Sequence, residues 1–361
     1  MSGCPNDTLR IGLLGCGAIS QFAHLPALAK ARGVRLAALC DGAEDLLQTI
    51  GRRNGVQRLY TRYEELLGDS EVDAVLIAAP DPFHVPLALE ALQAGKHVLV
   101  EKPLSDNSVD CEALVRAVRE TGLKLQVGCM KRHDPGIAYA HEFIRDRLGP
   151  VFSVSGWYRD TSFRPAIQET LLPPLLNSAH SVRPRVDPKG DRQRYSLWTH
   201  SAHLFDNLLF LAGPIRAVTA KLARLDERFS WHGVLEFADG GVGNFELSVK
   251  VNEGWSEGYI VHGAGGSVHV ETFIPFYHRP SMVRAFDASG ALSTTPLGEH
   301  SNPFKNQLEA FARAVREDLP PSPDVYDGLA VVRIIEAVER SVTSGERIEI
   351  PPTVRPTDAS R

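Results

Sequence analysis

The first third of the chain alternates between two spacings of apolar residues. Short apolar runs, typical of buried strands, are separated by segments whose apolar residues recur every three or four positions, as on one face of a helix. We expect strands over residues 9–14, 34–40, 57–60, 74–78, 97–100 and 123–128. We expect helices over residues 21–32, 44–53, 85–94 and 108–121, of which the last two end at Gly95 and Gly122. Strands and helices in this order predict an α/β fold with a doubly wound parallel sheet.

The pattern changes after Lys131. A helix and a strand, a proline-rich passage, a second helix, several alternating stretches and two final helices then follow one another. Their expected ranges are 137–147, 151–158, 159–194, 197–211, 215–284, 304–317 and 326–344. Alternation within 215–284 is typical of an antiparallel sheet. A chain of 361 residues exceeds what one hydrophobic core usually serves, so we expect two domains, residues 1–130 and 131–361.

The passage 159–194 is the longest stretch for which we expect little regular structure. Five of its residues are prolines that interrupt helices and strands: Pro165, Pro173, Pro174, Pro184 and Pro188. A loop of this length inside a compact domain is usually functional or mobile. A substrate lid, an arm that contacts another subunit and a solvated insertion without function are the three interpretations left open.

Composition and charge exclude several classes of protein. The 39 basic and 44 acidic residues give a net charge of -5. The chain therefore lacks the positive charge that is typical of proteins that bind nucleic acid or an anionic membrane. The apolar runs are strand-sized and the first residues lack the features of a secretory signal, so we expect a cytoplasmic protein. The 5 cysteines show no zinc or disulfide spacing. We therefore expect reduced thiols and no metal.

A glycine-rich turn lies between the first strand and the first helix. Its residues are Gly15, Cys16, Gly17, Ala18, Ile19 and Ser20. Such a turn lets backbone N–H groups approach a pyrophosphate, so it predicts a dinucleotide-binding Rossmann domain even though Ser20 replaces the third glycine. Asp41 ends the second strand, where a carboxylate accepts hydrogen bonds from the adenosine ribose and repels a 2′-phosphate. We therefore expect NAD rather than NADP as the cofactor.

Two more segments end strands at the same edge of the predicted sheet. Ala79 and Pro80 follow the fourth strand and would cover the cofactor, while His84 either starts the next helix or touches the ligand. Glu101 and Lys102 follow the fifth strand. A lysine there lies where such sheets place their chemistry, although an ion pair with a carboxylate would also explain it. Glu101 is expected to support the loop or to lie near the nicotinamide ribose.

These segments belong to a set of motifs that runs along nearly the whole chain. The set comprises Pro80, His84, the run 94–98 (AGKHV), Glu101-Lys102-Pro103, the run 128–135 (GCMKRHDP), His203 with Asp206 and Gly213, and Asp327-Gly328-Leu329. It resembles the Gfo/Idh/MocA family of oxidoreductases. The resemblance implies an N-terminal nucleotide-binding domain and a C-terminal α+β domain with a large, mostly antiparallel sheet. It also implies a dehydrogenase that acts on a secondary hydroxyl of a sugar or cyclitol.

The resemblance further implies which residues take part in the reaction. Lys102 matches the family's lysine and His203 its histidine, but the family's aspartate position is Thr199 in this chain. A threonine cannot hold the negative charge that would stabilise an imidazolium. The proton acceptor is therefore open between Lys102, His203 and the nearby His200, and His203 could also be a histidine of the core.

Substrate-binding candidates lie in the segments expected to border the cleft. Donors and aromatic faces commonly hold hydroxyl-rich ligands. The candidates are Lys102, Arg132, Trp157, Tyr158, Arg159, Tyr195, His200 and His203. The run 197–203 (LWTHSAH) resembles a branch of the family that acts on glycosides and aminocyclitol-like compounds, so an aminoglycoside-like pseudosugar is one expected substrate class.

Two other functions remain open beside the dehydrogenase. One is an NAD-dependent glycosidase that works through a transient keto intermediate, and the other is a non-catalytic NAD-binding sensor. Net reduction of the cofactor separates the glycosidase from the dehydrogenase. We also expect a homodimer or homotetramer through the C-terminal sheet, because a broad sheet needs its exposed face covered.

Overall fold

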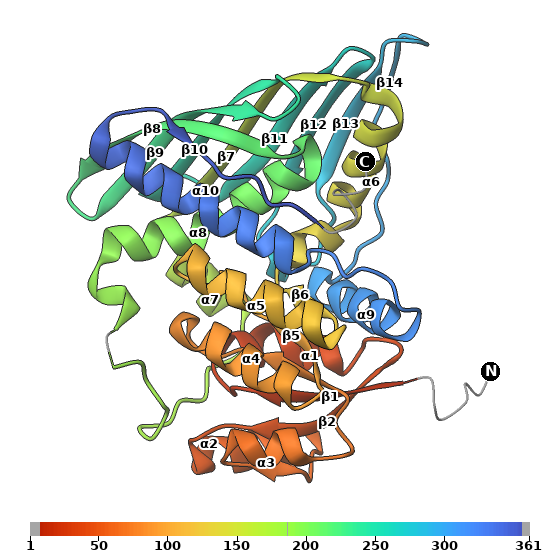
Figure 1. Ribbon diagram of the computed structural model, residues 1–361, viewed down its shortest axis with the longest axis vertical. Helices are drawn as coiled ribbons and strands as arrows, with labels where there is room; N and C mark the ends of the chain where they lie inside the picture. The colour runs from red at the N-terminus through yellow and green to blue at the C-terminus, as the bar shows by residue number, and fades with distance from the viewer. Residues whose placement is uncertain (1–7, 186, 356–361) are drawn as a thin grey trace. The chain divides into compact units, whose positions relative to one another are not determined.

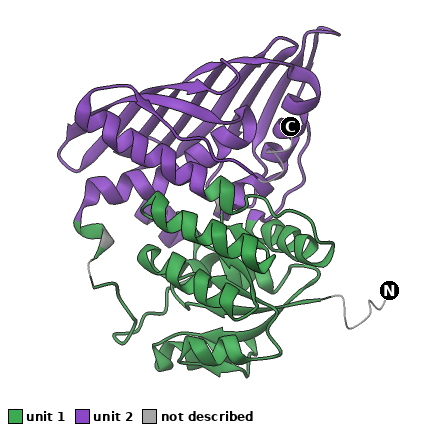
Figure 2. Ribbon diagram, in the orientation of Figure 1, with its two compact units in different colours: residues 1–128, 172–190, 304–328 green, residues 129–171, 191–303, 329–361 purple. Residues whose placement is uncertain are grey.

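The computed structural model describes residues 8–185 and 187–355 (Figure 1). Within them the chain forms two compact units, which Figure 2 distinguishes by colour. Unit 1 consists of the described residues up to Gly128 together with the stretches Leu172–Gly190 and Phe304–Gly328, and the remaining described residues form unit 2. The units are therefore not two consecutive stretches of chain.

Unit 1 contains a parallel sheet, in which we find six strands among the described residues. They are β1 (Leu9–Leu14), β2 (Val34–Cys40), β3 (Leu59–Tyr60), β4 (Ala74–Ile77), β5 (His97–Val100) and β6 (Leu125–Val127). Their order is β3-β2-β1-β4-β5-β6, and each neighbouring pair is parallel. This order confirms the doubly wound sheet and places its topological switch point between β1 and β4, where such folds bind ligands.

The helices of unit 1 follow the predicted pattern with three differences. They are η2 (Ser20–His24), α1 (Leu25–Leu28), α2 (Glu44–Asn54), α3 (Tyr63–Gly68), η3 (Asp81–Phe83), α4 (His84–Gln93), α5 (Ser108–Thr121), η6 (Pro188–Gly190) and nearly all of α9 (Pro303–Arg316). The first helix ends at Leu28 rather than at residue 32, and its π-helical turn η2 precedes Pro26, which has no N–H to donate. The short α3 was not predicted. Gly95 and Gly122 follow the two later helices in the left-handed conformation, at φ 77° and 69°, as expected.

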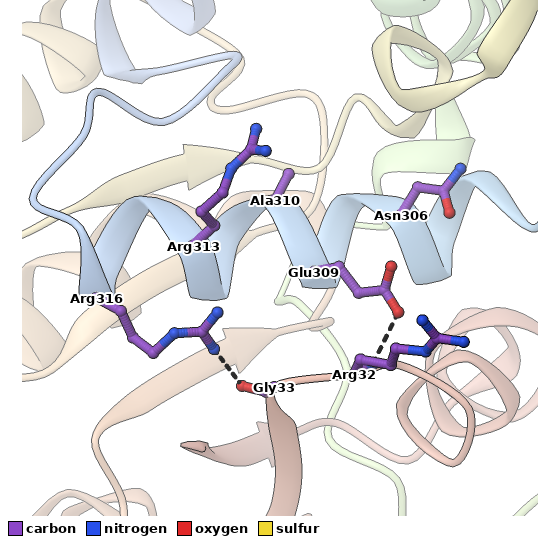
Figure 3. A pocket seen from close by; sticks show the side chains of 7 residues that line it. All are labelled: Arg32, Gly33, Asn306, Glu309, Ala310, Arg313 and Arg316. Atoms are coloured by element: carbon purple, nitrogen blue, oxygen red, sulfur yellow. Dashed lines mark hydrogen bonds between the residues drawn. The ribbon is translucent and has the colours of Figure 1, made fainter. Parts of the chain in front are cut away.

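Helix α9 returns to unit 1 through hydrogen bonds with the turn that precedes β2 (Figure 3). The backbone N–H of Arg32 donates to Glu309 Oε1 at 2.7 Å, and Arg316 Nη1 donates to the Gly33 carbonyl at 3.0 Å. Further along, the N–H of Val127 donates to the carbonyl of Pro323 at 3.0 Å. These contacts explain why a segment near the C-terminus belongs to the N-terminal unit.

Unit 2 is built on a mixed sheet, in which the described residues supply nine strands. They are β7 (Val151–Thr161), β8 (Ile215–Leu225), β9 (Arg228–Phe237), β10 (Val242–Val251), β11 (Ser256–Gly263), β12 (Gly266–Thr272), β13 (Met282–Asp287), β14 (Leu292–Thr294) and β15 (Ile348–Glu349). The order is β14-β13-β12-β11-β7-β10-β9-β8-β15. The pair β7 and β10 is parallel, and the other neighbouring strands of this sheet within the described residues are antiparallel, so the mostly antiparallel sheet is confirmed.

Several helices complete unit 2. They are η4 (Met130–His133), α6 (Pro135–Phe143), η5 (Ile144–Leu148), α7 (Arg164–Leu171), α8 (Arg192–Ala212), η7 (Pro275–Tyr277) and α10 (Val325–Ser344), whose first turn lies in unit 1. Helix α8 packs on β7 at Gly156, where an added Cβ would lie 2.9 Å from Leu208. Phe205 of α8 also packs against the sheet, because its ring centre lies 5.1 Å from that of Phe245 in β10. The buried stripe of α8 therefore fixes which of its residues face away from the sheet.

The passage 159–194 is more regular than we predicted. Strand β7 continues to Thr161, α7 covers Arg164–Leu171, and α8 already begins at Arg192. The expectation of little regular structure was wrong for these parts. Pro165 lies in the first turn of α7, where a missing N–H costs nothing because that N–H has no helical partner. None of the helices in the described ranges is long and apolar enough to cross a lipid bilayer.

Candidate active site

A cavity of about 470 Å³ opens at the carboxyl edge of the unit 1 sheet, beside the switch point. Sixteen residues line it: Leu14, Gly15, Gly17, Cys40, Asp41, Gly42, Leu46, Thr61, Tyr63, Ala78, Ala79, Pro80, Phe83, Leu87, Ser181 and Val182. Five of the predicted cofactor residues are among them, namely Gly15, Gly17, Asp41, Ala79 and Pro80. The glycine turn, the end of β2 and the loop after β4 therefore meet at one cavity.

The glycine turn has the backbone geometry that a pyrophosphate needs. Gly15 has a φ of +95°, and an added Cβ would lie 2.5 Å from the carbonyl oxygen of Ala78. A Cβ at Gly17 would meet nothing within 4 Å, so the backbone there is open to a ligand. Ser20, in the third glycine position, is fully buried and its Oγ donates to the Gly15 carbonyl at 2.6 Å. The hydroxyl thus closes the turn from inside, and the residues present fit a dinucleotide.

The Asp41 carboxylate is fixed at the end of β2 by two backbone donors. Its Oδ2 accepts from the N–H of Cys16 at 2.7 Å, and its Oδ1 accepts from the N–H of Ala43 at 2.8 Å. An ionised carboxylate has about four acceptor positions, so both oxygens can still accept from ribose hydroxyls. The charge and the remaining acceptors suit a free 2′-hydroxyl.

Four cysteines of the described part of the chain are buried and form no disulfide: Cys16, Cys40, Cys111 and Cys129. Burial, with a smaller contribution from Asp41, raises the pKa of Cys16 and of Cys40 to about 12, so both are protonated thiols at neutral pH. Cys4 lies outside the described residues. No group of three or more metal-ligating side chains occurs among the residues that the structure describes.

His84 joins two of the predicted cofactor segments. Its ring is fully buried, with Nδ1 2.7 Å from the Pro103 carbonyl and Nε2 2.9 Å from the Ala79 carbonyl. These contacts hold the loop after β4 against the loop after β5. His84 therefore supports the two loops and does not line the cavity. Ala18 and Ile19 do not line the cavity either.

Glu101, which precedes Lys102, is hydrogen-bonded to His24 of the first helix. His24 Nε2 lies 2.8 Å from Glu101 Oε1, and the backbone N–H of Lys102 donates to Glu101 Oε2 at 3.2 Å. Burial raises the pKa of Glu101, but the hydrogen bond with His24 and the charges of His24, Lys102 and His84 outweigh it, so the net pKa is lowered. The carboxylate is therefore charged at neutral pH, and Lys102, partly exposed, follows it.

In unit 2, Arg132 is part of a buried ion pair rather than an open donor. Its Nε and Nη2 donate to the two carboxylate oxygens of Asp206 at 2.9 and 2.7 Å. Both side chains are at most 5% exposed, and the guanidinium lies 4.9 Å from the Phe210 ring centre. The pair ties η4 to α8.

A cluster around Tyr158 brings together residues from four segments of unit 2. The Tyr158 ring lies 5.4 Å from that of His200 and 5.6 Å from that of Trp255. Lys131 Nζ lies 4.9 Å from the Tyr158 ring centre and 5.0 Å from that of Trp255, and it pairs with the buried carboxylate of Glu257. Burial raises the pKa of Tyr158 to about 12, so its hydroxyl is protonated and able to donate. We call Lys131, Tyr158, His200, Trp255 and Glu257 the tyrosine cluster.

His200 of this cluster also faces a carboxylate. Its Nε2 is 3.9 Å from Asp160 Oδ2, while Arg164 donates to Asp160 Oδ1 at 2.7 Å. Burial raises the pKa of Asp160 although Arg164 opposes the change. Sequence reasoning named His200 and Tyr158 but missed Lys131, Trp255, Glu257 and Asp160. Lys131 lies within the GCMKRHDP motif, which could have signalled it.

Helix α8 carries the two remaining candidates. Thr199 and His203 are both partly exposed, one helical turn apart, whereas Leu204 and Leu208 are fully buried. Asp206 does not share that exposed face, because it is buried with Arg132. Lys102 belongs to unit 1, whereas His203 belongs to unit 2.

Comparison with known proteins identifies both halves of the chain. Residues 9–129 match the model of the GFO_IDH_MocA oxidoreductase family, NAD-binding Rossmann fold. Residues 195–350 match the model of the C-terminal alpha/beta domain of the same oxidoreductase family. The two matches together extend over most of the chain.

Whole-length relatives agree with these matches. The chain is 26% identical to inositol 2-dehydrogenase of Rubrobacter xylanophilus over 97% of its length and 96% of that protein. It is 27% identical to D-xylose 1-dehydrogenase (NADP(+)) 2 of Haloferax volcanii over 95% of its length and 100% of that protein. A solved levoglucosan dehydrogenase, in complex with NADH and levoglucosan, has the same fold with a TM-score of 0.78 at 22% identity, covering 96% of this chain and 100% of that one. The chain therefore belongs to the Gfo/Idh/MocA family and is an oxidoreductase with an NAD-binding Rossmann domain.

Proposed function

We propose that the protein transfers a hydride between NAD and a secondary hydroxyl, or the corresponding ketone, of a sugar, glycoside, cyclitol or aminoglycoside-like pseudosugar. The observation that carries the proposal is the cavity at the switch point, with Asp41 fixed on two backbone N–H groups beside the open Gly17. Relatives named for inositol and xylose support the substrate class. When bound, the nicotinamide accepts or returns the hydride.

Lys102 is the group that accepts the substrate's hydroxyl proton in this proposal. It follows β5 at the carboxyl edge of the sheet and is not one of the residues that line the cavity. The preceding Glu101 is charged and hydrogen-bonded to His24. A lysine becomes a base near neutral pH when a low-dielectric site and a nearby positive charge disfavour its ammonium form.

A histidine of α8 relays the proton or polarises the reacting oxygen. His203 is the candidate from the family resemblance, with Thr199 one turn before it as a hydrogen-bonding neighbour. His200 is the alternative, and the nearby Asp160 carboxyl favours it, because a carboxylate can stabilise an imidazolium and Thr199 cannot. Single alanine variants of the two histidines separate these roles.

The tyrosine cluster recognises the hydroxyl-rich substrate. Trp255 is partly exposed and offers an aromatic face that suits a sugar or cyclitol ring. Tyr158, 3% exposed, packs against Trp255 and against the buried His200. Arg132 supports this wall through Asp206. The paired Lys131 and Glu257 lie behind the rings and fix their position.

Self-association through the unit 2 sheet is also part of the proposal. On the strands of this sheet, Val234, Val242, Met282 and Phe286 are 42–51% exposed, while at least one sequence neighbour of each is buried. Apolar side chains that alternate with buried ones form an uncovered face, which a second copy would cover. Size-exclusion chromatography with light scattering tests this, and a monomer would contradict it.

The test of the function measures reduced nicotinamide by absorbance with purified protein, NAD and a panel of polyols. The panel contains inositols, xylose, levoglucosan, amino sugars and aminocyclitols, and each corresponding ketone is tested with NADH. We expect NADH formation with at least one compound of these classes. Tight NAD binding without turnover of any of them would contradict the dehydrogenase, and release of a free sugar without net NADH would instead indicate a glycosidase.

A further inference from the structure

We propose that residues 172–185 form a strap that is part of the cofactor site: it borders the adenosine end of the dinucleotide cavity and places an apolar side chain where a 2′-phosphate would project. The strap leaves unit 2 after α7 and lies against unit 1, as Figure 2 shows by its colour. The proposal rests on NAD binding in the cavity described above. It gives a function to part of the proline-rich passage 159–194, which the family motifs do not cover.

The first attachment of the strap is to the glycine turn. Gln21 Nε2 donates to the Leu176 carbonyl at 2.9 Å, and Gln21 Oε1 accepts from the Leu176 N–H at 3.0 Å. The same Nε2 donates to the Cys16 carbonyl at 2.8 Å. One side-chain amide thus binds both backbone groups of a strap residue and a carbonyl of the turn that faces the pyrophosphate position. The strap is therefore attached directly to the cofactor-binding backbone.

The second attachment is to the helix that follows Asp41. Ser178 Oγ donates to Asp45 Oδ1 at 2.7 Å and accepts from the N–H of His180 at 3.0 Å. The hydrogen bond from Ser178 is the largest of the effects that lower the pKa of Asp45. Ser178 is 9% exposed, so this part of the strap is buried against α2. In the sequence, Gln21 precedes Asp41 and Asp45 follows it, so the strap is attached to residues on both sides of this carboxylate.

Between and beyond these attachments the strap reaches the cavity itself. Ser181 and Val182 are lining residues, and a Cβ added to Gly42 would lie 2.6 Å from Val182 Cγ2. Gly42 follows Asp41, whose carboxylate is expected to accept a hydrogen bond from the ribose 2′-hydroxyl. Val182 is nevertheless 63% exposed, so its apolar side chain has surface left for a ligand. An isopropyl group therefore stands next to the position from which a 2′-phosphate would project.

The chemistry of the lining agrees with this placement. None of the lining residues that the structure describes is an arginine, lysine or histidine. A 2′-phosphate would meet the Asp41 charge and the Val182 side chain without a cation to compensate. Selection of NAD is thus assigned to two elements, the charge at the end of β2 and the bulk of the strap.

The experiment measures dinucleotide affinity by calorimetry and release by stopped-flow fluorescence of NADH in the full chain. We expect Val182→Gly to weaken NAD binding about five- to tenfold, since apolar surface is lost, and to raise the NADH release rate by a similar factor. Val354→Gly is the matched control, a valine of similar exposure outside unit 1, and it is expected to leave both values unchanged. The double variant Val182→Gly with Asp41→Ser is expected to gain more NADP affinity than Asp41→Ser alone.

The attachment is tested by a double-mutant cycle between Ser178→Ala and Asp45→Asn. If the strap is held by this hydrogen bond, each variant speeds NADH release about threefold and the double variant does so no further. Amide hydrogen exchange of the wild type provides a measurement that needs no variant: NAD is expected to slow exchange over residues 174–184.

The outcomes separate this proposal from the proposed function. If the wild type binds NAD while Val182→Gly keeps wild-type affinity, or while exchange over 174–184 does not change with NAD, the strap is not part of the site. If the wild type binds no NAD, the proposed function fails together with the strap. Equal NADP affinity of Asp41→Ser with and without Val182→Gly would overturn the assignment of specificity to the strap.

Discussion

The proposed cofactor site of unit 1, called the cofactor half below, and the proposed substrate-binding cluster of unit 2, called the substrate half, are built by different means. The cofactor half, in unit 1, depends on backbone: Gly15 at φ +95°, the open Gly17, and N–H groups that hold Asp41. The substrate half, in unit 2, depends on side chains that come from distant parts of the sequence, such as Tyr158 and Trp255. Backbone geometry demands particular residue types at fixed spacing, whereas a side-chain cluster can be assembled in many ways.

The largest expected effect is the loss of the buried cation from the substrate half. Lys131→Met leaves the carboxylate of Glu257 buried without its partner and is expected to lower the free energy of unfolding by about 3–5 kcal/mol. Thermal or urea unfolding measures this. The double variant Lys131→Met with Glu257→Leu is expected to recover much of the loss, and no recovery would show that the ion pair is not what orders the cluster.

The second prediction concerns the reaction itself and compares the two units. Lys102→Ala is expected to reduce kcat by roughly 10²-fold or more while NAD affinity stays within about threefold of the wild type. Lys30→Ala, an exposed lysine of the same unit, serves as control. A near-normal kcat for Lys102→Ala would move the proton acceptor to the histidines of α8, which His200→Ala and His203→Ala would then distinguish.

The third prediction tests whether the cofactor half depends on backbone. Gly15→Ala is expected to destabilise the protein by about 1–3 kcal/mol, because its φ is positive and a Cβ would contact the Ala78 carbonyl. Gly17→Ala has open space and is expected to keep wild-type stability but to weaken NAD binding. Thermal unfolding and calorimetry measure the two effects. Equal stability losses in both variants would mean that the turn is not specialised in this way.

The smallest effect expected is a shift in acid stability. The pKa of Glu101 is lowered in the folded chain, so its contribution to stability is present above the unfolded pKa and is lost as the pH falls through the folded pKa. His24→Gln removes part of what lowers that pKa and is expected to move the acid unfolding midpoint to higher pH. His300→Gln, an exposed histidine of unit 2, is the control. An unchanged midpoint in His24→Gln would contradict the role of this pair.

The same contrast explains what could be predicted from the sequence. Strand β2 (Val34–Cys40) and helix α5 (Ser108–Thr121) were predicted with their observed bounds, because the apolar period and the terminal Gly122 are local signals. The glycine turn and Asp41 were found for the same reason. Helix α3 was missed because six residues show too little of a period. Alternation predicted the sheet of unit 2 but not the parallel pair β7 and β10, whose strands are far apart in sequence.

Contacts between distant residues account for the rest. The prolines of 159–194 indicated a loop, but not that Gln21 and Asp45 would bind Leu176 and Ser178, which lie more than a hundred residues later. In the same way, nothing near Tyr158 in sequence indicates Trp255. The substrate half and the strap therefore needed the folded chain.

The central claim is tested most directly by following hydride. A polyol of the panel carrying deuterium on the carbon of the reacting hydroxyl is mixed with NAD and the protein, and the nicotinamide is analysed by mass spectrometry. We predict that deuterium appears in NADH with the wild type and, in the same interval, is nearly absent with Lys102→Ala. NAD bound to the protein without any transfer of deuterium from any compound of the panel would contradict it.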